Sequence, residues 1–190
     1  TNDIGSALEF LVTRLGPPPL KTLTVSPIPG TFGQGFPGLI YISTLAYLNP
    51  SDRPMPLQSE ANRLFFSELL HDHETAHQWW GNLVTSASYQ DDWLMEALAN
   101  YSALMALEKR KGRKTLEYVL DEYRQDLLKK DKEGEIIESA GPLIWGSRLQ
   151  SSRDAAAWRP VVYEKGTWVV HMLRERMGDE KFFKMLGEVV

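Results

Sequence analysis

Apolar residues recur at helical spacing through most of this chain, and that periodicity limits the fold more than any other feature. Two short stretches differ: residues 20–26 alternate in polarity, and residues 38–48 contain a β-branched apolar run, so both resemble strands. Gly- and Pro-rich residues 27–37 and turn-rich residues 49–56 read as loops. The pattern predicts an α+β fold that is mainly helical, with a small N-terminal β portion. The expected helices span residues 3–15, 59–80, 91–111, 113–130, 163–177 and 179–189.

The size and charge of the chain bound its class. Its 190 residues suit one domain, in which residues 1–56 would form a helix plus the small β portion and residues 57–190 the helical part. A net charge of −4 without a basic cluster gives no reason to expect a nucleic-acid partner. The chain has no run of about 18 apolar residues, so we expect no membrane contact from this segment. Nothing in the sequence indicates a compartment.

The most informative motif is His73-Glu74-Thr75-Ala76-His77, inside the expected helix 59–80. Side chains four residues apart on a helix are neighbours, so the two imidazoles can bind one metal ion. Glu74 lies beside them without being needed as a ligand, and it can take a proton from an attacking water. His71 points to the other side of the helix and is expected to be structural or exposed. The alternative is a helix that carries two ordinary histidines.

A catalytic zinc takes three protein ligands and leaves one position open. The chain has no cysteine, so the third ligand is expected to be a carboxylate, and the candidate is Glu96, early in the next helix. A partly exposed helix glutamate is the alternative reading. Asn100 follows one turn later on the same face. It is a candidate for a hydrogen bond that orients one of the metal ligands, and the alternative is an exposed asparagine with no such role.

These residues resemble the gluzincin metallopeptidases, in which the two-histidine motif is followed, after eighteen intervening residues, by a glutamate. The flanking sequences His77-Gln-Trp-Trp-Gly-Asn-Leu-Val-Thr85 and Trp93-Leu-Met-Glu96 are similar to the membrane alanyl aminopeptidase family, which includes the leukotriene hydrolases. Tyr163-Glu-Lys-Gly166 matches a further motif of that family. The three motifs occur in the expected order over most of the chain.

The resemblance implies a thermolysin-like zinc metallopeptidase catalytic domain over residues 1–190. It implies one Zn²⁺ bound by His73, His77 and Glu96, with Glu74 as general base and proton shuttle. It also implies that Tyr163 donates its hydroxyl to the oxyanion formed on a peptide substrate. Family members carry domains on either side of this one, so we expect flanking domains in the full-length protein. We therefore expect the isolated segment to bind zinc and to be weakly active or inactive.

The chain departs from the family at the strand that grips the substrate amine. The family has Gly-x-Met-Glu-Asn there, and aligning the Gly-Leu-Ile that follows puts Gly35 at the glutamate position. No Asp or Glu occurs between Phe10 and Ser51. Gly35, Phe36 and Gly38 remain candidates for a strand that pairs with substrate backbone.

Three functions therefore stay open. The first is an aminopeptidase-like zinc peptidase, and the second is an endopeptidase or other amide hydrolase on the same scaffold, which the missing glutamate favours. The third is a non-catalytic peptidase-like binding domain, against which the complete set of motif residues argues.

Overall fold

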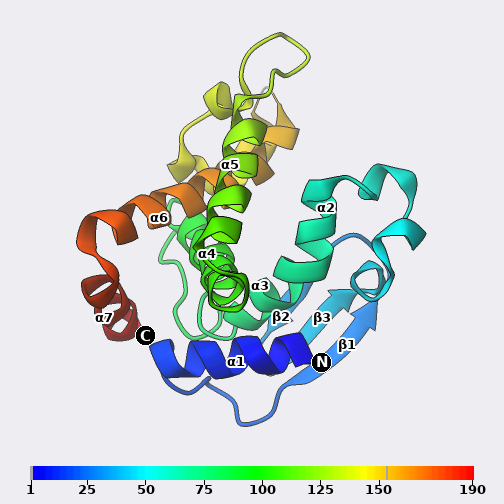
Figure 1. The fold of residues 1–190 in the computed structure, drawn as a ribbon. Helices are drawn as coiled ribbons and strands as arrows, with labels where there is room; N and C mark the ends of the chain where they lie inside the picture. Colours follow the sequence, from blue (N-terminus) through cyan, green and yellow to red (C-terminus); the bar gives the residue numbers. More distant parts are fainter. Residues whose placement is uncertain (1, 153) are drawn as a thin grey trace.

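A computed structural model describes residues 2–152 and 154–190 (Figure 1). The centre of the fold is α4 (Asp92–Lys111), which packs against α3 (Leu70–Ala76), α5 (Arg113–Leu128) and α6 (Gly166–Met177). Its small residues, such as Ala99 and Ala103, are fully buried and let these neighbours approach closely.

Two helices from opposite ends of the described chain pack together at one side of this centre. α1 (Asn2–Leu15) contacts α3, α4 and α7 (Asp179–Val189). The C-terminus therefore lies beside the end of α1 (Figure 1). Within the described residues, no helix is long and apolar enough to cross a membrane.

The β portion is a three-stranded sheet in the order β1-β3-β2. β1 (Thr24–Ile28) runs parallel to the central strand β3 (Leu39–Ser43), and β2 (Gln34–Phe36) runs antiparallel to β3. Ile40 and Ile42 of β3 are fully buried and form a separate core cluster with Phe66 and Leu70. The sheet thereby packs against the segment that leads into α3, with β2 at the edge next to that helix.

The expected strand positions were partly wrong. Residues 20–23 are not in a strand, and β1 continues through Pro27, where the sequence predicted a loop. β1 is an edge strand, so the missing N–H of Pro27 need not enter the ladder between the strands. The expected loop 27–37 also contains β2, whose three residues are too few for a polarity pattern.

The expected helix 59–80 is three segments rather than one. α2 (Glu60–Leu64) passes into a π-helical segment η4 (Phe65–Leu69), and α3 follows and ends at Ala76. Beyond it the chain turns, and the N–H groups of Leu83 and Val84 both donate to the carbonyl of Trp79. A π turn shifts the helical phase without changing which residues are apolar, so periodicity does not reveal it.

The later helices follow the expectation more closely. α4, α5, α6 and α7 lie within a few residues of their predicted bounds. The structure adds a second π segment, η8 (Pro160–Lys165), directly before α6, so the expected helix start at residue 163 falls inside it. Before η8 the described chain forms short 3₁₀ turns at Ile137–Ala140, Leu143–Ser151 and Ala155–Ala157. α4 begins at Asp92, and the side chain of the preceding Asp91 makes no capping hydrogen bond.

Candidate metal centre and active site

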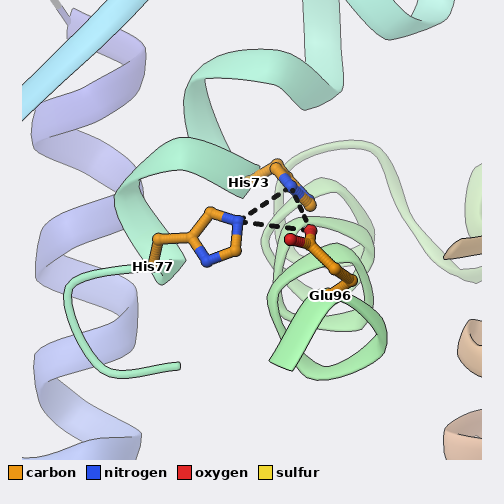
Figure 2. A group of neighbouring side chains, drawn as sticks. All are labelled: His73, His77 and Glu96. Carbon is orange, nitrogen blue, oxygen red and sulfur yellow. Dashed lines mark hydrogen bonds and ion pairs between the residues drawn. The ribbon is translucent and has the colours of Figure 1, made fainter. Parts of the chain in front are cut away.

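His73, His77 and Glu96 meet between α3 and α4 (Figure 2). The Nε2 atoms of the two histidines are 3.1 Å apart, and Glu96 Oε2 lies 3.4 Å from each of them. Figure 2 shows both imidazoles directed at the carboxylate. Both histidines are buried, and Glu96 is partly buried. The three residues expected from spacing are thus brought together in space.

The donor set fits a zinc ion. Tetrahedral zinc with bonds of about 2.0–2.1 Å holds its ligand atoms about 3.3 Å apart. The three separations in this cluster lie close to that value. Glu96 Oε2 is buried and accepts no hydrogen bond from the described residues, so it has an unused electron pair. Two imidazoles and one carboxylate leave the fourth position open, as catalytic zinc requires.

The surroundings of His77 prepare its Nε2 for binding a cation. Its Nδ1 lies 2.8 Å from the carbonyl oxygen of Trp80 and donates to it, which directs Nε2 at the cluster, where a metal ion would replace the Nε2 proton. Burial lowers the pKa of His77, but the carboxylates of Glu96 and Glu74 outweigh it and raise the pKa to about 9. The site therefore favours positive charge. His73 Nδ1, in contrast, is buried without a hydrogen-bond partner among the described residues.

Glu74 lies next to the two histidines and is 4% exposed. Burial raises its pKa and the charge of Glu96 adds to this, while the histidines and a backbone hydrogen bond from Gly35 act in the opposite direction. A carboxylate with a raised pKa is suited to accept a proton and release it again. Glu74 is not one of the three side chains whose ligand atoms converge.

Strand β2 lies against this part of α3. A Cβ atom on Gly35 would come within 2.6 Å of the Glu74 carbonyl oxygen and 2.7 Å of His77 Cβ, and one on Gly33 would come within 2.5 Å of Glu74 Oε1. Only glycine fits at position 35, because the distances to a backbone oxygen and a Cβ atom are far below van der Waals contact, whereas a Cβ atom at position 33 would require the Glu74 side chain to shift.

Side chains from beyond α3 hold the same strand. Gln78 donates to the carbonyl of Phe36 and accepts from the N–H of Gly38, and Asn82 donates to the carbonyl of Gly35. The sequence analysis missed both residues, whose polar character gave no separate signal. Pairing of Gly35, Phe36 and Gly38 with a substrate stays a prediction.

Tyr163 reaches the same site from η8. Its ring centroid lies 5.8 Å from that of His73, at an interplanar angle of 30°, and its ring packs edge-on against Trp158. Burial raises the pKa of Tyr163, and the charges of Glu96 and Glu74 raise it further, so its hydroxyl keeps its proton. Tyr163 is therefore a hydrogen-bond donor beside the cluster.

Asn100 lies one turn after Glu96, as expected, but its amide donates to Tyr123 and Thr167 and not to a histidine or Glu96.

His71 is buried and packs edge-on against Tyr47, which agrees with the structural role expected for it. Tyr123 and Thr167 were missed, because the sequence alone does not show that α5 and α6 meet α4 behind Tyr163.

The site opens into a cavity of about 510 Å³. His73, Glu74 and Tyr163 line it together with Gly33 and Gln34. Its walls also contain the apolar side chains of Phe32, Leu57, Phe65, Phe66 and Trp158. A partly apolar cavity that ends on a cluster of ligand atoms is the usual form of an active site.

Glu164, another residue that the sequence analysis gave no role, also lines the cavity. Its Oε2 is buried without a hydrogen-bond partner among the described residues. Burial and nearby Asp126 raise its pKa to about 8, although Arg159 and Lys129 act against this. At neutral pH this carboxyl group is therefore mainly uncharged.

The convergent ligand atoms have the arrangement expected of a metal-dependent peptidase with two histidine ligands and one glutamate ligand. Residues 56–190 match the Peptidase family M1 domain, and the chain belongs to that family. Endoplasmic reticulum aminopeptidase 2 of Homo sapiens is 31% identical over 130 residues, which are 66% of this chain and 12% of that protein. Aminopeptidase N of Lactococcus lactis is 32% identical over 122 residues, which are 60% of this chain and 13% of that protein.

The solved structure of yeast LTA4 hydrolase in complex with bestatin has a similar fold, with a TM-score of 0.69 at 20% identity. The likeness covers 98% of this chain and 28% of that chain. The chain thus spans about an eighth of the length of the curated aminopeptidases it matches. These comparisons support the coarse fold expectation of a mainly helical domain with a small sheet.

Proposed function

We propose that this domain is the catalytic domain of a zinc-dependent peptidase that hydrolyses peptide bonds in the manner of its aminopeptidase relatives. The observation that carries the proposal is the convergence of the ligand atoms of His73, His77 and Glu96 beside a cavity that His73, Glu74 and Tyr163 line. Zinc, when bound, acts as a Lewis acid that polarises the scissile carbonyl and makes water acidic enough to attack near neutral pH.

Glu74 and Tyr163 have complementary roles in this proposal. Glu74 accepts the proton of the attacking water and passes it to the leaving amine, for which its raised pKa is suited. Tyr163 keeps its proton and donates a hydrogen bond to the oxyanion that develops on the carbonyl. The substrate is a peptide, held in the cavity between β2 and η8. Residues 1–190 alone are expected to bind zinc and to have little activity, because relatives are much longer.

The direct experiment compares the full-length, zinc-loaded protein with its Glu74→Gln variant on short peptides that have a free N-terminus. Glutamine keeps the size of the side chain but cannot accept the proton, so kcat should fall by about 10²–10⁴-fold at unchanged zinc content. Equal rates for the two proteins would refute hydrolysis at this site. The remaining interpretation would then be a non-catalytic peptidase-like binding domain.

A second candidate, an endopeptidase, is favoured by the contact between Gly35 and α3. The family's amine-binding glutamate belongs at position 35, where a Cβ atom would lie 2.6 Å from the Glu74 carbonyl oxygen. Glu164 lines the same cavity, but its pKa is raised to about 8, so near pH 7 it is a weaker partner for a cationic amine than an ionised carboxylate would be. The ratio of kcat/KM between free and N-acetylated forms of one peptide separates the candidates. A ratio near one favours the endopeptidase, and a strong preference for the free amine favours the aminopeptidase.

A further inference from the structure

A buried polar chain runs from α4 through α6 to the backbone of Tyr163. Thr167 Oγ1 donates to the carbonyl oxygen of Tyr163 at 2.6 Å, and Asn100 Nδ2 donates to Thr167 Oγ1 at 2.9 Å. The Asn100 amide also donates to the hydroxyl of Tyr123 at 3.1 Å. Asn100 is 5% exposed and Thr167 is fully buried, so water does not compete for these bonds.

This chain connects the two sides of the site. Asn100 follows Glu96 by one helical turn on α4, whereas Tyr163 belongs to η8, which comes from a distant part of the sequence. α4 also packs closely against the start of α6, directly after η8, because a Cβ atom on Gly166 would lie 2.8 Å from Ala97 Cβ. The polar chain therefore fixes the tyrosine backbone relative to the helix that carries the carboxylate ligand.

The backbone at Tyr163 needs such a restraint more than a regular helix would. η8 is a π segment, and its first residue, Pro160, has no N–H to donate. The Tyr163 carbonyl accepts from the Gly166 N–H as well as from Thr167 Oγ1. A threonine that bonds back to the carbonyl four residues earlier alters local helix geometry, and here that carbonyl belongs to Tyr163.

We propose that Asn100 and Thr167 are positioning residues that hold the Tyr163 hydroxyl in its productive place relative to the metal centre. The inference rests on the proposed function, because it assigns Tyr163 to the reaction. Thr167 is not among the residues that line the cavity, and Asn100, which does line it, donates to Thr167 and Tyr123. Both act through the tyrosine backbone, and a displacement of about 1 Å at a catalytic group is enough to lower the rate by about 10²-fold.

The test uses Thr167→Val in the full-length, zinc-loaded protein. Valine keeps the shape of threonine but lacks the hydroxyl, so the bond to Tyr163 is lost. We expect kcat to fall by roughly 10–100-fold, with KM and zinc content nearly unchanged. Thr167→Ser restores the hydroxyl and should recover most of kcat. Amide hydrogen exchange in residues 161–166 should become faster in Thr167→Val.

Tyr101→Phe is the control. The Tyr101 hydroxyl is within 3.0 Å of His171 Nδ1, so it forms another buried bond between α4 and α6, outside the residues that line the cavity. Its loss should lower stability and leave kcat and the exchange of residues 161–166 unchanged.

A Thr167→Val variant that behaves like Tyr101→Phe in kcat or in exchange would overturn the positioning role. This outcome differs from failure of the proposed function, in which the unmodified protein and Glu74→Gln hydrolyse peptides equally. In that case Tyr163 would have no reaction to serve, and the positioning role would fall with it.

Discussion

Helix α4 contributes a glutamate to two clusters that each contain histidine. Near its start, Glu96 meets His73 and His77, and further along, Glu108 lies in a second cluster with Tyr101, His171 and Arg174. In the second cluster, Arg174 donates to Glu108 at 2.6 Å and to Asp179 at 2.8 Å. There the donors meet acceptors within the protein.

The first cluster lacks this balance. Its three ligand atoms face one another, and Glu96 Oε2 accepts no hydrogen bond from the described residues. The two histidines also differ, because burial lowers the pKa of His171 whereas nearby carboxylates raise that of His77. A polar cluster whose donors and acceptors are all paired within the protein contributes to the stability of the fold. A cluster whose ligand atoms face one another is suited to bind a metal cation.

The largest expected difference between the clusters concerns zinc. Glu96→Gln removes a ligand and should weaken zinc binding by more than the roughly 10–100-fold that loss of an outer partner costs. Glu108→Gln makes the same chemical change on the same helix, and it should leave zinc affinity unchanged. Competition with a chromophoric chelator measures both, and equal losses would remove the distinction between the clusters.

Tyr163 and Tyr101 extend the comparison to catalysis. Tyr163→Phe removes the hydroxyl beside the metal centre, and kcat should fall by about 10²–10³-fold, as expected for loss of an oxyanion donor. Tyr101→Phe removes a hydroxyl from the second cluster, and steady-state kinetics should show kcat within about twofold of the unmodified protein, since its bond partners lie outside the cavity. Unchanged kcat in Tyr163→Phe would remove that residue from the mechanism.

Arg174→Met tests the second cluster as a source of stability. Arg174 is 4% exposed, and its loss leaves Glu108 without its closest partner. The free energy of unfolding should fall by about 3 kcal/mol, because a buried ion pair is broken on one side. Lys184→Met, in an exposed pair with Glu188, should change it by less than about 1 kcal/mol. Chemical denaturation checks both, and zinc content should stay constant.

A separate expected effect concerns pH and Glu164, in the cavity wall. The unfolded chain releases this proton near the ordinary value of 4.5, whereas the folded protein keeps it up to about pH 8. Folding therefore becomes less favourable as pH rises between these values, by up to about 1.4 kcal/mol per pH unit. Glu164→Gln should remove this slope, and Glu133→Gln, at an exposed site, should not. Chemical denaturation at several pH values measures the free energy of unfolding for each variant. A slope that is unchanged in Glu164→Gln would contradict the assignment of a buried, neutral carboxyl group to Glu164.

The ligand set was predictable because it depends on local spacing. His73 and His77 share one helix. In a chain without cysteine the third ligand was expected to be a carboxylate, and Glu96 was chosen for its place early in the next helix and for its match to the family's spacing. Helix extents were predictable for the same reason, apart from the π segments at Phe65–Leu69 and Pro160–Lys165, which leave polarity patterns intact.

The contacts between distant segments were not predictable from spacing. Thr167 and Tyr123 meet Asn100 only because α5 and α6 both pack on α4. The family resemblance predicted a role for Tyr163, but it gave none for Thr167, whose hydroxyl donates to the Tyr163 carbonyl. The absence of a carboxylate at Gly35 was visible in the sequence, whereas its physical reason, the contact with Glu74 and His77, needed the structure.

The central claim is that His73, His77 and Glu96 form a catalytic zinc centre. Anomalous diffraction at the zinc edge, from crystals of the zinc-loaded protein, tests it most directly. The account predicts one strong peak about 2.0–2.2 Å from His73 Nε2, His77 Nε2 and Glu96 Oε2, with a fourth position left for water or substrate. A fully loaded protein with no peak at these atoms, or with its zinc bound by other residues, would contradict it.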